Sequence, residues 1–236
     1  MKKILLNIIF FFPITFLVFS IVLVCSLSGK RSIDWTPLMF KREFQFRKEH
    51  LCTKQHWVPL SQISAEAVKA IVMSEDDRFF NHNGVDIIEI ENMYYSYKRG
   101  DKELRGCSTI SQQVAKNCFT FSNSTILRKV AELYWTSLIE MFWSKERILE
   151  VYLNVMEVGK GLYGIEAAAN EYFHCTSKEM TLHDAAELAV CLPLPLKVTP
   201  FNVWRESPSK VERLLFRLKK GDYMVWTKEV NFLNLL

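Results

Sequence analysis

The sequence predicts a mainly α-helical protein with one N-terminal transmembrane helix. Apolar residues recur at helical spacing through most of the chain after Ser61, and strand-like alternation is scarce. An uncharged run at residues 4–25 is long enough, at helical rise, to cross the hydrocarbon core of a bilayer. The chain has 236 residues and a formal net charge of +4. These values fit one compact domain with an additional apolar element.

Residues 1–29 are predicted to form a cytoplasmic tip and a transmembrane anchor. Lys2 and Lys3 precede the apolar run, which favours a cytoplasmic N-terminus with the rest of the chain outside. A cleaved signal peptide is the alternative, because small residues stand at positions 26–29. The apolar run exceeds the roughly 7 to 15 residues of a typical signal-peptide core, so the anchor is favoured.

Residues 30–57 are predicted to be a juxtamembrane segment in which aromatic and basic residues alternate. The aromatic residues suit either of two roles, membrane-interface anchors or packing against the following domain. They are Trp35, Phe40, Phe44, Phe46 and Trp57. Basic residues suit anionic head groups, so membrane lipid is an expected partner.

Residues 58–236 are expected to form the main domain, which includes a basic helix near its C-terminal end. Its first helix begins after Ser64, a suitable N-cap, carries one apolar stripe and ends near Glu75. Residues 86–106 are predicted to be a helix broken into an exposed loop around Gly100.

Further helices are expected along the rest of the domain. They are predicted at residues 108–117, 125–142, 145–156, 165–173, 182–192 and 208–220. The helix at 125–142 has its apolar stripe at Leu127, Val130, Ala131, Tyr134, Leu138, Met141 and Phe142. Ser144 and Ser207 are suitable N-caps for the helices that follow them.

Six cysteines are spread over the chain without the spacing of a metal site. A helical domain of this size does not require disulfides, so most are expected to be small buried hydrophobes. Cys118, Cys175 and Cys191 are the expected exceptions, which an oxidising exterior would pair.

Two glutamates stand on separate predicted helices. Glu75 is followed by Asp76, and neighbouring carboxylates raise one another's pKa toward a value suited to accepting a proton. Glu132 follows Arg128 by one helical turn, and this cation should keep it ionised. Taken alone, these residues fit either glycosidic chemistry by a pair of carboxylates or ordinary solvated ion pairs.

Five sequence blocks occur in an order that resembles a known family. They are "EDDRFFNHNGVD", "GCSTISQQVAKN", "RKVAE", "SKERILEVYLN" and "GLYGIEAAANEYF". Together they resemble the peptidoglycan glycosyltransferases, specifically the short monofunctional membrane-anchored kind, related to the glycosyltransferase domain of class A penicillin-binding proteins. The resemblance spans about residues 59–200.

The resemblance implies a lysozyme-like helical glycosyltransferase domain at the outer, periplasmic face of the cytoplasmic (inner) membrane. Such an enzyme polymerises glycan strands from lipid II, with the polyprenyl-pyrophosphate-linked growing glycan as donor and the 4-hydroxyl of the lipid II GlcNAc as acceptor. The transfer is inverting, because direct attack on an α-linked donor forms a β-linked product. Peptidoglycan synthesis of this kind serves cell wall biogenesis and cell shape.

The resemblance also implies roles for individual residues. Glu75 would be the general base and Glu132 the second catalytic carboxylate, which orients cations or holds a divalent ion bridging the diphosphate. Asp76 would tune Glu75. The remaining substrate-binding residues implied are Phe79, His82, Gly84, Gly106, Ser108, Thr109, Gln113, Lys116, Arg128 and Lys129. Of these, His82 is in general more often structural than substrate-binding.

The chain departs from the family pattern at two positions of one block. Cys107 stands where the family has a second glycine, which places a side chain where glycine suits a positive φ. Ser111 replaces threonine and keeps the hydroxyl. A divalent cation, Mg²⁺ or Mn²⁺, is a family expectation without an independent signature in this sequence.

Alternative functions and partners follow from the same sequence. A lysozyme-like lytic enzyme would need an acid with a raised pKa in an apolar pocket, and a non-catalytic cell-wall scaffold draws its support from Cys107. The residues after Pro200 are too few for a transpeptidase domain. Cell-wall transpeptidases and divisome or elongation proteins are therefore expected partners, and nucleic acid is not.

Overall fold

The computed structural model describes residues 2–49, 52–100, 107–121 and 126–221, with side chains from residue 11 onward. Its helices are α1 (Lys2–Leu27), α2 (Pro37–Gln45), α3 (Ala65–Glu75), α4 (Ile87–Lys98), α5 (Ile110–Phe119), α6 (Ile126–Phe142), α7 (Lys145–Val155), α8 (Ile165–Ala168), α9 (Leu182–Cys191), α10 (Val203–Glu206) and α11 (Pro208–Lys220). Single turns of 3₁₀ helix lie at Arg47–Glu49, Leu60–Gln62 and Phe79–Asn81, and a π-helical turn at Ala169–Phe173. The prediction of a mainly helical fold is confirmed.

A small sheet joins the beginning and the middle of the domain. It contains β1 (Lys54–Gln55), β2 (Glu157–Gly159) and β3 (Leu162–Tyr163) in the order β1-β3-β2. The β1 and β3 strands are parallel, and β2 and β3 are antiparallel. Asn154 is fully buried beside this sheet, where it donates to the carbonyl of Val58 at 2.9 Å and accepts from its N–H at 2.8 Å. The amide of Asn154 thereby satisfies both the N–H and the carbonyl of Val58, which lies beyond the end of the short strand β1.

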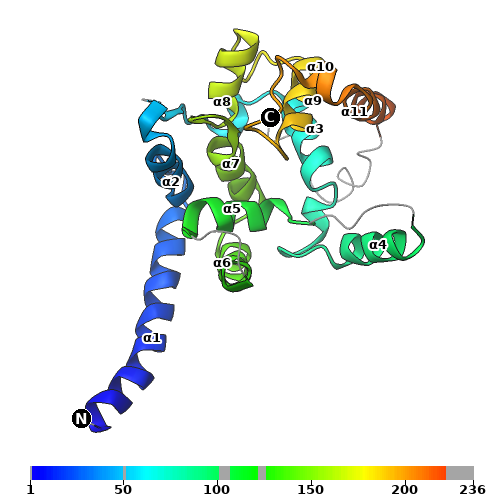
Figure 1. Cartoon of the computed structure of the whole chain (residues 1–236). Helices are drawn as coiled ribbons and strands as arrows, with labels where there is room; N and C mark the ends of the chain where they lie inside the picture. Colours follow the sequence, from blue (N-terminus) through cyan, green and yellow to red (C-terminus); the bar gives the residue numbers. More distant parts are fainter. Residues whose placement is uncertain (1, 50–51, 101–106, 122–125, 222–236) are drawn as a thin grey trace.

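The core surrounds α7, which is buried along most of its length. Ser144 caps this helix by accepting from the N–H of Arg147 at 3.2 Å, as predicted. The α5 helix packs across α7 and α6, and α3 packs against α9 (Figure 1). Ser64 caps α3 in the same way, by accepting from Ala67. Ser207 stands before α11 but makes no side-chain cap hydrogen bond.

The α1 helix extends away from the body of the protein and is held at its C-terminal end (Figure 1). The indole N–H of Trp143 donates to the carbonyl of Val24 at 2.8 Å, and Arg147 donates twice to the carbonyl of Leu27. Among the helices whose side chains are described, none is both long and apolar enough to cross a membrane. The membrane span therefore stays a prediction.

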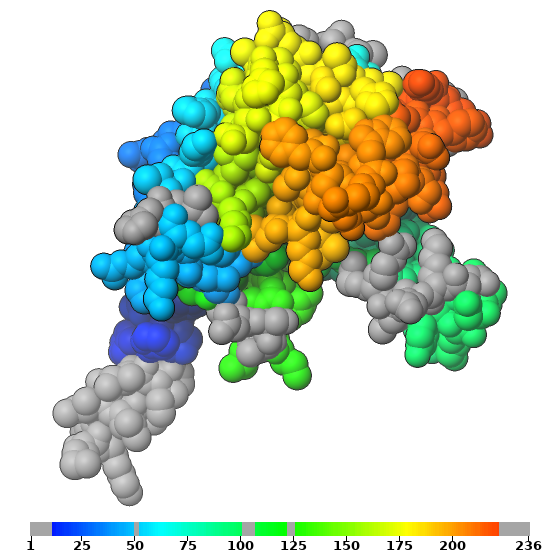
Figure 2. Space-filling view, turned by 45° about the horizontal axis from the view of Figure 1, so that its top comes forward, coloured from blue at the N-terminus to red at the C-terminus, as the bar shows by residue number. Residues whose placement is uncertain are grey.

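The apolar stripe predicted for α6 does not form its buried face. Of the predicted stripe, Leu138 is buried, but Leu127, Val130, Met141 and Phe142 are exposed. The other buried residues of α6 lie outside the stripe and are Glu132, Trp135, Thr136 and Ile139. The spacing of the stripe is helical, but the domain core contacts a different face of the helix. A second exposed apolar surface lies on α4, which projects from one side of the body (Figures 1 and 2).

The aromatic residues of the juxtamembrane segment differ in burial. Phe46 is buried, whereas Trp35, Phe40 and Phe44 are exposed. All six cysteines are free, so the pairing expected for Cys118, Cys175 and Cys191 is wrong. The expectation that most cysteines are buried is also wrong, because Cys191 is the one that is fully buried, while Cys25 and Cys52 are exposed. Burial raises the pKa of the Cys118 thiol to about 12, which keeps it protonated and unreactive.

Candidate active site

An open cleft of about 1400 Å³ crosses the domain beside α5. Its walls come from α2, the end of α3, α5, α6, the end of α7 and the turn after α9. Glu75 and Tyr152 lie in this cleft together with Lys116, Arg128 and Glu132. The two glutamates, predicted on separate helices, therefore line the same cavity.

Glu75 is the last residue of α3 and is partly buried. Gln113 on α5 donates to its Oε2 at 2.6 Å, and the phenol of Tyr152 on α7 donates a second hydrogen bond. Loss of solvent raises the pKa of Glu75, and this effect exceeds the lowering by the two donors. The neighbouring Asp76 adds a smaller upward effect, so burial rather than carboxylate crowding is the main cause.

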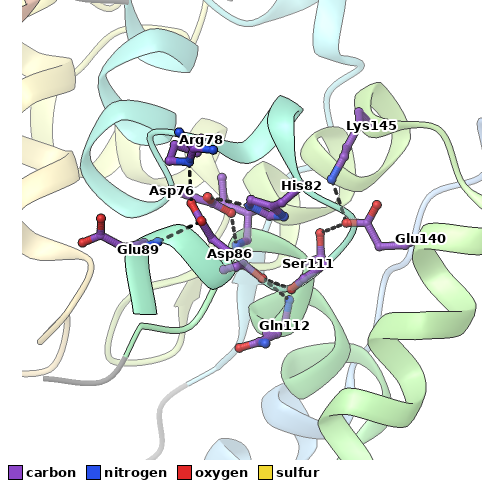
Figure 3. Close-up of polar contacts among 12 residues, drawn as sticks. Asp76, Arg78, His82, Asp86, Glu89, Ser111, Gln112, Glu140 and Lys145 are labelled. Atoms are coloured by element: carbon purple, nitrogen blue, oxygen red, sulfur yellow. Dashed lines mark hydrogen bonds and ion pairs between the residues drawn. The ribbon is translucent and has the colours of Figure 1, made fainter. Parts of the chain in front are cut away.

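Asp76 organises the loop that follows α3. His82 Nε2 lies 2.9 Å from Asp76 Oδ1, and the N–H of Ile110 donates to Asp76 Oδ2 at 2.9 Å. Asp86 pairs with Arg78 at 3.2 Å and caps α4 by accepting from Glu89 (Figure 3). The predicted structural role of His82 agrees with this contact, because it joins two parts of one loop.

Phe79 and Gly84 occupy the turn between α3 and α4. Phe79 is fully buried, with the ammonium of Lys145 lying 4.5 Å from its ring centroid. Gly84 has a φ of 89°, and a Cβ at this position would lie 2.6 Å from Cγ2 of Thr136. Both the backbone conformation and the packing therefore require glycine here.

Thr109 connects this turn to α5. Its hydroxyl donates to the carbonyl of Gly84 at 2.6 Å and accepts from the N–H of Gln112 at 3.2 Å, which caps the helix. Ser111, on the next turn, donates to Glu140, and Lys145 donates to the same carboxylate (Figure 3). The block that contains Thr109 is thus tied to the turn at Gly84 and to α6.

Cationic side chains gather at one end of the cleft. Glu132 is buried and pairs with Arg128 and, at 3.3 Å, with Lys129. Lys129 also donates to Gln112 at 2.9 Å and to Ser108 at 3.3 Å. The predicted exposed ion pair of Glu132 is therefore a buried one, in which the carboxylate holds two cations.

Lys116 faces the same end of the cleft. Partial desolvation lowers its pKa, and the nearby guanidinium of Arg128 lowers it further. The pKa of Lys129 is lowered by the same two causes. Repulsion among these cations indicates a place where an anion would be stabilised.

The residues around Glu132 do not fit a divalent ion held by the protein. Both carboxylate oxygens contact cationic side chains, whereas Mg²⁺ and Mn²⁺ require several oxygen ligands. Within the described ranges, the group with suitable spacing is Asp76, His82 and Asp86. Its oxygens are already engaged by a backbone N–H and Arg78, so it gives no second indication of a metal.

The remaining predicted site residues can also be placed. Gly106 lies outside the described residues. Cys107 lines the cleft, with its Sγ 3.6 Å from Sδ of Met93. In the described part of the chain, His174 is the one residue other than glycine with a positive φ. Cys107 therefore does not adopt the positive φ that would strain its backbone.

Sequence reasoning missed three groups that line the cleft. Tyr152 lies among apolar residues at helical spacing in the helix predicted at 145–156, where a tyrosine is usually part of the core. Gln112 is buried, and its amide oxygen orients Lys129. Lys41 and Arg42 come from the juxtamembrane segment, and no sequence motif connects them with the later blocks.

A partly buried carboxylate and a cluster of cations in one cleft of a helical domain are typical of a glycosyl-transferring enzyme with an anionic leaving group. The family model described as transglycosylase matches residues 45–219. The chain belongs to this transglycosylase family, which confirms the resemblance seen in the sequence blocks.

Relatives with high identity share a single name, biosynthetic peptidoglycan transglycosylase. The protein of this name from Bacteroides thetaiotaomicron is 45% identical over 181 residues, which are 75% of this chain and 71% of the relative. The one from Bdellovibrio bacteriovorus is 44% identical over 183 residues, covering 77% of this chain and 72% of the relative. The one from Pseudomonas entomophila is 44% identical over 164 residues, which are 69% of each chain.

Proposed function

We propose that this enzyme polymerises peptidoglycan glycan strands from lipid II. The observation that carries the proposal is the position of Glu75 in one cleft with the cations held by Glu132. Family membership and the shared name of the relatives support it. The growing glycan, linked to polyprenyl diphosphate, is the donor, and the 4-hydroxyl of the lipid II GlcNAc is the acceptor.

Glu75 acts as the general base in this reaction. Its carboxylate takes the proton from the acceptor hydroxyl while the oxygen attacks the anomeric carbon of the donor. The donors Gln113 and Tyr152 fix the orientation of the carboxylate. The raised pKa makes ionised Glu75 a stronger base than an exposed glutamate. One displacement without a covalent sugar intermediate inverts the configuration at the anomeric carbon.

The cations stabilise the departing diphosphate. Negative charge grows on the leaving group as the glycosidic bond breaks, and fixed cations near it lower the energy of the transition state. Lys116, Arg128 and Lys129 supply this charge, and Glu132 holds the last two in place. Because Glu132 is engaged in this way, no step of the mechanism passes through a metal ion.

We further propose that α1 anchors the enzyme in the cytoplasmic membrane, with the catalytic domain on its outer face. The support is the 26-residue length of α1 and the uncharged sequence from residue 4 to residue 25. The α4 and α6 helices, which carry exposed apolar side chains, lie on the side of the body toward which α1 extends (Figure 1). A membrane surface there would cover them. Cross-linking would be carried out by cell-wall transpeptidases that act with this enzyme, together with divisome or elongation proteins.

The proposed function is tested with purified full-length protein in detergent and labelled lipid II. The wild type should form a ladder of glycan products, and Glu75→Gln should lose at least ~100-fold of the rate. Glu212→Gln is the matched control, because Glu212 is exposed on α11 and lies outside the cleft. A fully active Glu75→Gln variant would exclude Glu75 as the base, and absence of polymer from the wild type would contradict the function.

The lytic alternative is favoured by one observation, the raised pKa of Glu75. The sequence predicted a raised pKa from the neighbouring Asp76, whereas burial is its main cause in the structure. Incubation of the same protein with purified sacculi separates the two activities. Soluble glycan fragments from sacculi, without polymer from lipid II, would establish hydrolysis instead of synthesis.

A further inference from the structure

The α2 helix brings the juxtamembrane segment into the wall of the cleft. Thr36 caps α2 by accepting from the N–H of Met39 at 3.2 Å, and Met39 is fully buried. The helix packs on α5, which carries Lys116. Leu38, Lys41 and Arg42 follow at helical spacing and line the cleft. None of the five family-like sequence blocks includes these residues.

A salt bridge fixes α2 in this position. Arg42 Nε lies 2.8 Å from Oε1 of Glu157, and its Nη2 lies 3.0 Å from Oε2 of the same carboxylate. The two side chains are 22% and 10% exposed, so solvent screens this pair less than a surface pair. Glu157 is the first residue of β2, directly after the last turn of α7. The pairing therefore joins the juxtamembrane helix to the catalytic core.

Three cationic side chains, those of Lys41, Arg42 and Lys116, line this part of the cleft. Arg42 and Lys41 both act on Lys116 in the direction that disfavours its ammonium form, and Glu157 acts in the opposite direction. Glu157 is already paired with Arg42. A dianionic group between α2 and α5 would relieve the repulsion that these cations exert on one another.

We propose that Lys41 is a substrate-binding residue whose ammonium contacts the diphosphate of a polyprenyl-linked substrate. This inference rests on the proposed function, since polymerisation brings two diphosphates, those of donor and acceptor, into one cleft. Lys116 and the cations held by Glu132 serve the departing diphosphate, and Lys41 extends the positive wall from Lys116 toward the other diphosphate. The juxtamembrane segment then contributes to the active site in addition to connecting the anchor with the catalytic domain.

The test measures binding of undecaprenyl diphosphate to the full-length protein in detergent micelles. Lys41→Ala should weaken binding about five- to tenfold at low salt, and the difference should shrink as salt is added. Lys41→Arg should retain most of the affinity. Lys48→Ala is the matched control, because Lys48 is exposed in the next turn of the same segment and does not line the cleft. Unchanged affinity in Lys41→Ala, or an equal loss in Lys48→Ala, would overturn the inference.

An anionic lipid head group carries similar chemistry, so a second arm uses phosphatidylglycerol vesicles. Loss of vesicle binding in Lys41→Ala, with undecaprenyl diphosphate binding unchanged, would assign Lys41 to the membrane surface and overturn the inference. The binding measurement is also independent of polymerisation. Lys41-dependent binding in a protein that forms no glycan would leave the inference standing while the proposed function fails. If Lys41→Ala polymerised glycan and bound undecaprenyl diphosphate as the wild type does, the inference about Lys41 would fail while the proposed function would stand.

Discussion

Glu75 owes its properties to its own position in the fold and to two neighbours that come from two different helices. Its position at the end of α3 removes it from solvent, Gln113 of α5 binds one oxygen, and Tyr152 of α7 donates a second hydrogen bond. Burial favours the protonated form and the two donors favour the ionised form. The balance leaves a raised pKa, which suits a base that must accept a proton and release it in each cycle.

Removal of the Tyr152 hydroxyl should change the pH dependence of the reaction. The hydrogen bond stabilises the ionised carboxylate, so Tyr152→Phe should raise the pKa of Glu75 further. The acidic limb of the rate profile is expected to move upward by about one pH unit, measured as initial rate against pH. Tyr163→Phe is the matched control, since Tyr163 is also fully buried but its hydroxyl has no hydrogen-bond partner in the described residues. Identical profiles for both variants would show that the hydroxyl does not act on Glu75.

Glu75 should also reduce the stability of the folded protein at neutral pH. A carboxyl whose pKa is raised by folding binds its proton more tightly in the folded state, so the free energy of unfolding falls as pH rises through that range. Glu75→Gln should therefore have the higher melting temperature at about pH 7.5, and the difference should vanish near pH 4. Thermal unfolding at both values, beside Glu212→Gln, measures this. A Glu75→Gln variant less stable than the wild type at neutral pH would contradict the assigned direction.

The loop between α3 and α4 and the start of α5 form one structural unit. Asp76 binds both His82 and the N–H of Ile110, and Thr109 binds the carbonyl of Gly84. These bonds connect residues that are 6, 34 and 25 positions apart in the chain. The unit places Glu75 and Gln113 at hydrogen-bond distance, so its geometry determines that of the base.

Substitution of Gly84 should show how little space this unit leaves for an added side chain. Gly84→Ala places a Cβ against Thr136 in a backbone with positive φ, and we expect a loss of about 3 kcal/mol in the free energy of unfolding. Gly100→Ala is the matched control, because Gly100 has a φ of 76° and no atom of the described residues lies within 4 Å of the added Cβ. It should lose only about 1 kcal/mol. Equal losses in denaturant unfolding would mean that contact with Thr136 contributes nothing.

Arg147 connects the projecting α1 helix to the core of the molecule. Its guanidinium donates to the carbonyl of Leu27 and pairs with Glu150 at 2.7 Å. It also lies between the rings of Trp57 and Trp143, at 5.3 and 5.8 Å from their centroids. The buried side chain of Arg147 thereby satisfies a carbonyl at the C-terminal end of α1 and fixes α1 to the domain.

Loss of this connection should destabilise the whole protein. Arg147→Ala leaves Glu150 without its cation and a helix-end carbonyl without its donor, at an expected cost of about 3 kcal/mol in the free energy of unfolding. Cleavage by a protease in the segment between α1 and α2 should become faster. Arg205→Ala is the matched control, since Arg205 is 79% exposed in its pair with Glu206. Equal melting temperatures for the two variants would argue against Arg147 as the connection.

Much of the fold and part of the site could be predicted from residues that lie close together in the chain. The caps Ser64 and Ser144, the end of a helix at Glu75 and the helical pairing of Arg128 with Glu132 all follow from residues a few positions apart. Periodicity predicted the helices for the same reason, because hydrogen bonds within a helix join near neighbours. Five ordered blocks also indicated the family, which the comparisons confirm.

Contacts between distant segments determined the rest. The pKa of Glu75, the burial of Glu132 and the place of Lys41 in the cleft depend on residues that only folding brings together, such as Glu75 and Gln113, which are 38 positions apart. The buried face of α6 was predicted wrongly because periodicity shows that a helix has an apolar side but not which neighbour covers it. Desolvation acts through the local environment in three dimensions, and no spacing along the chain specifies it.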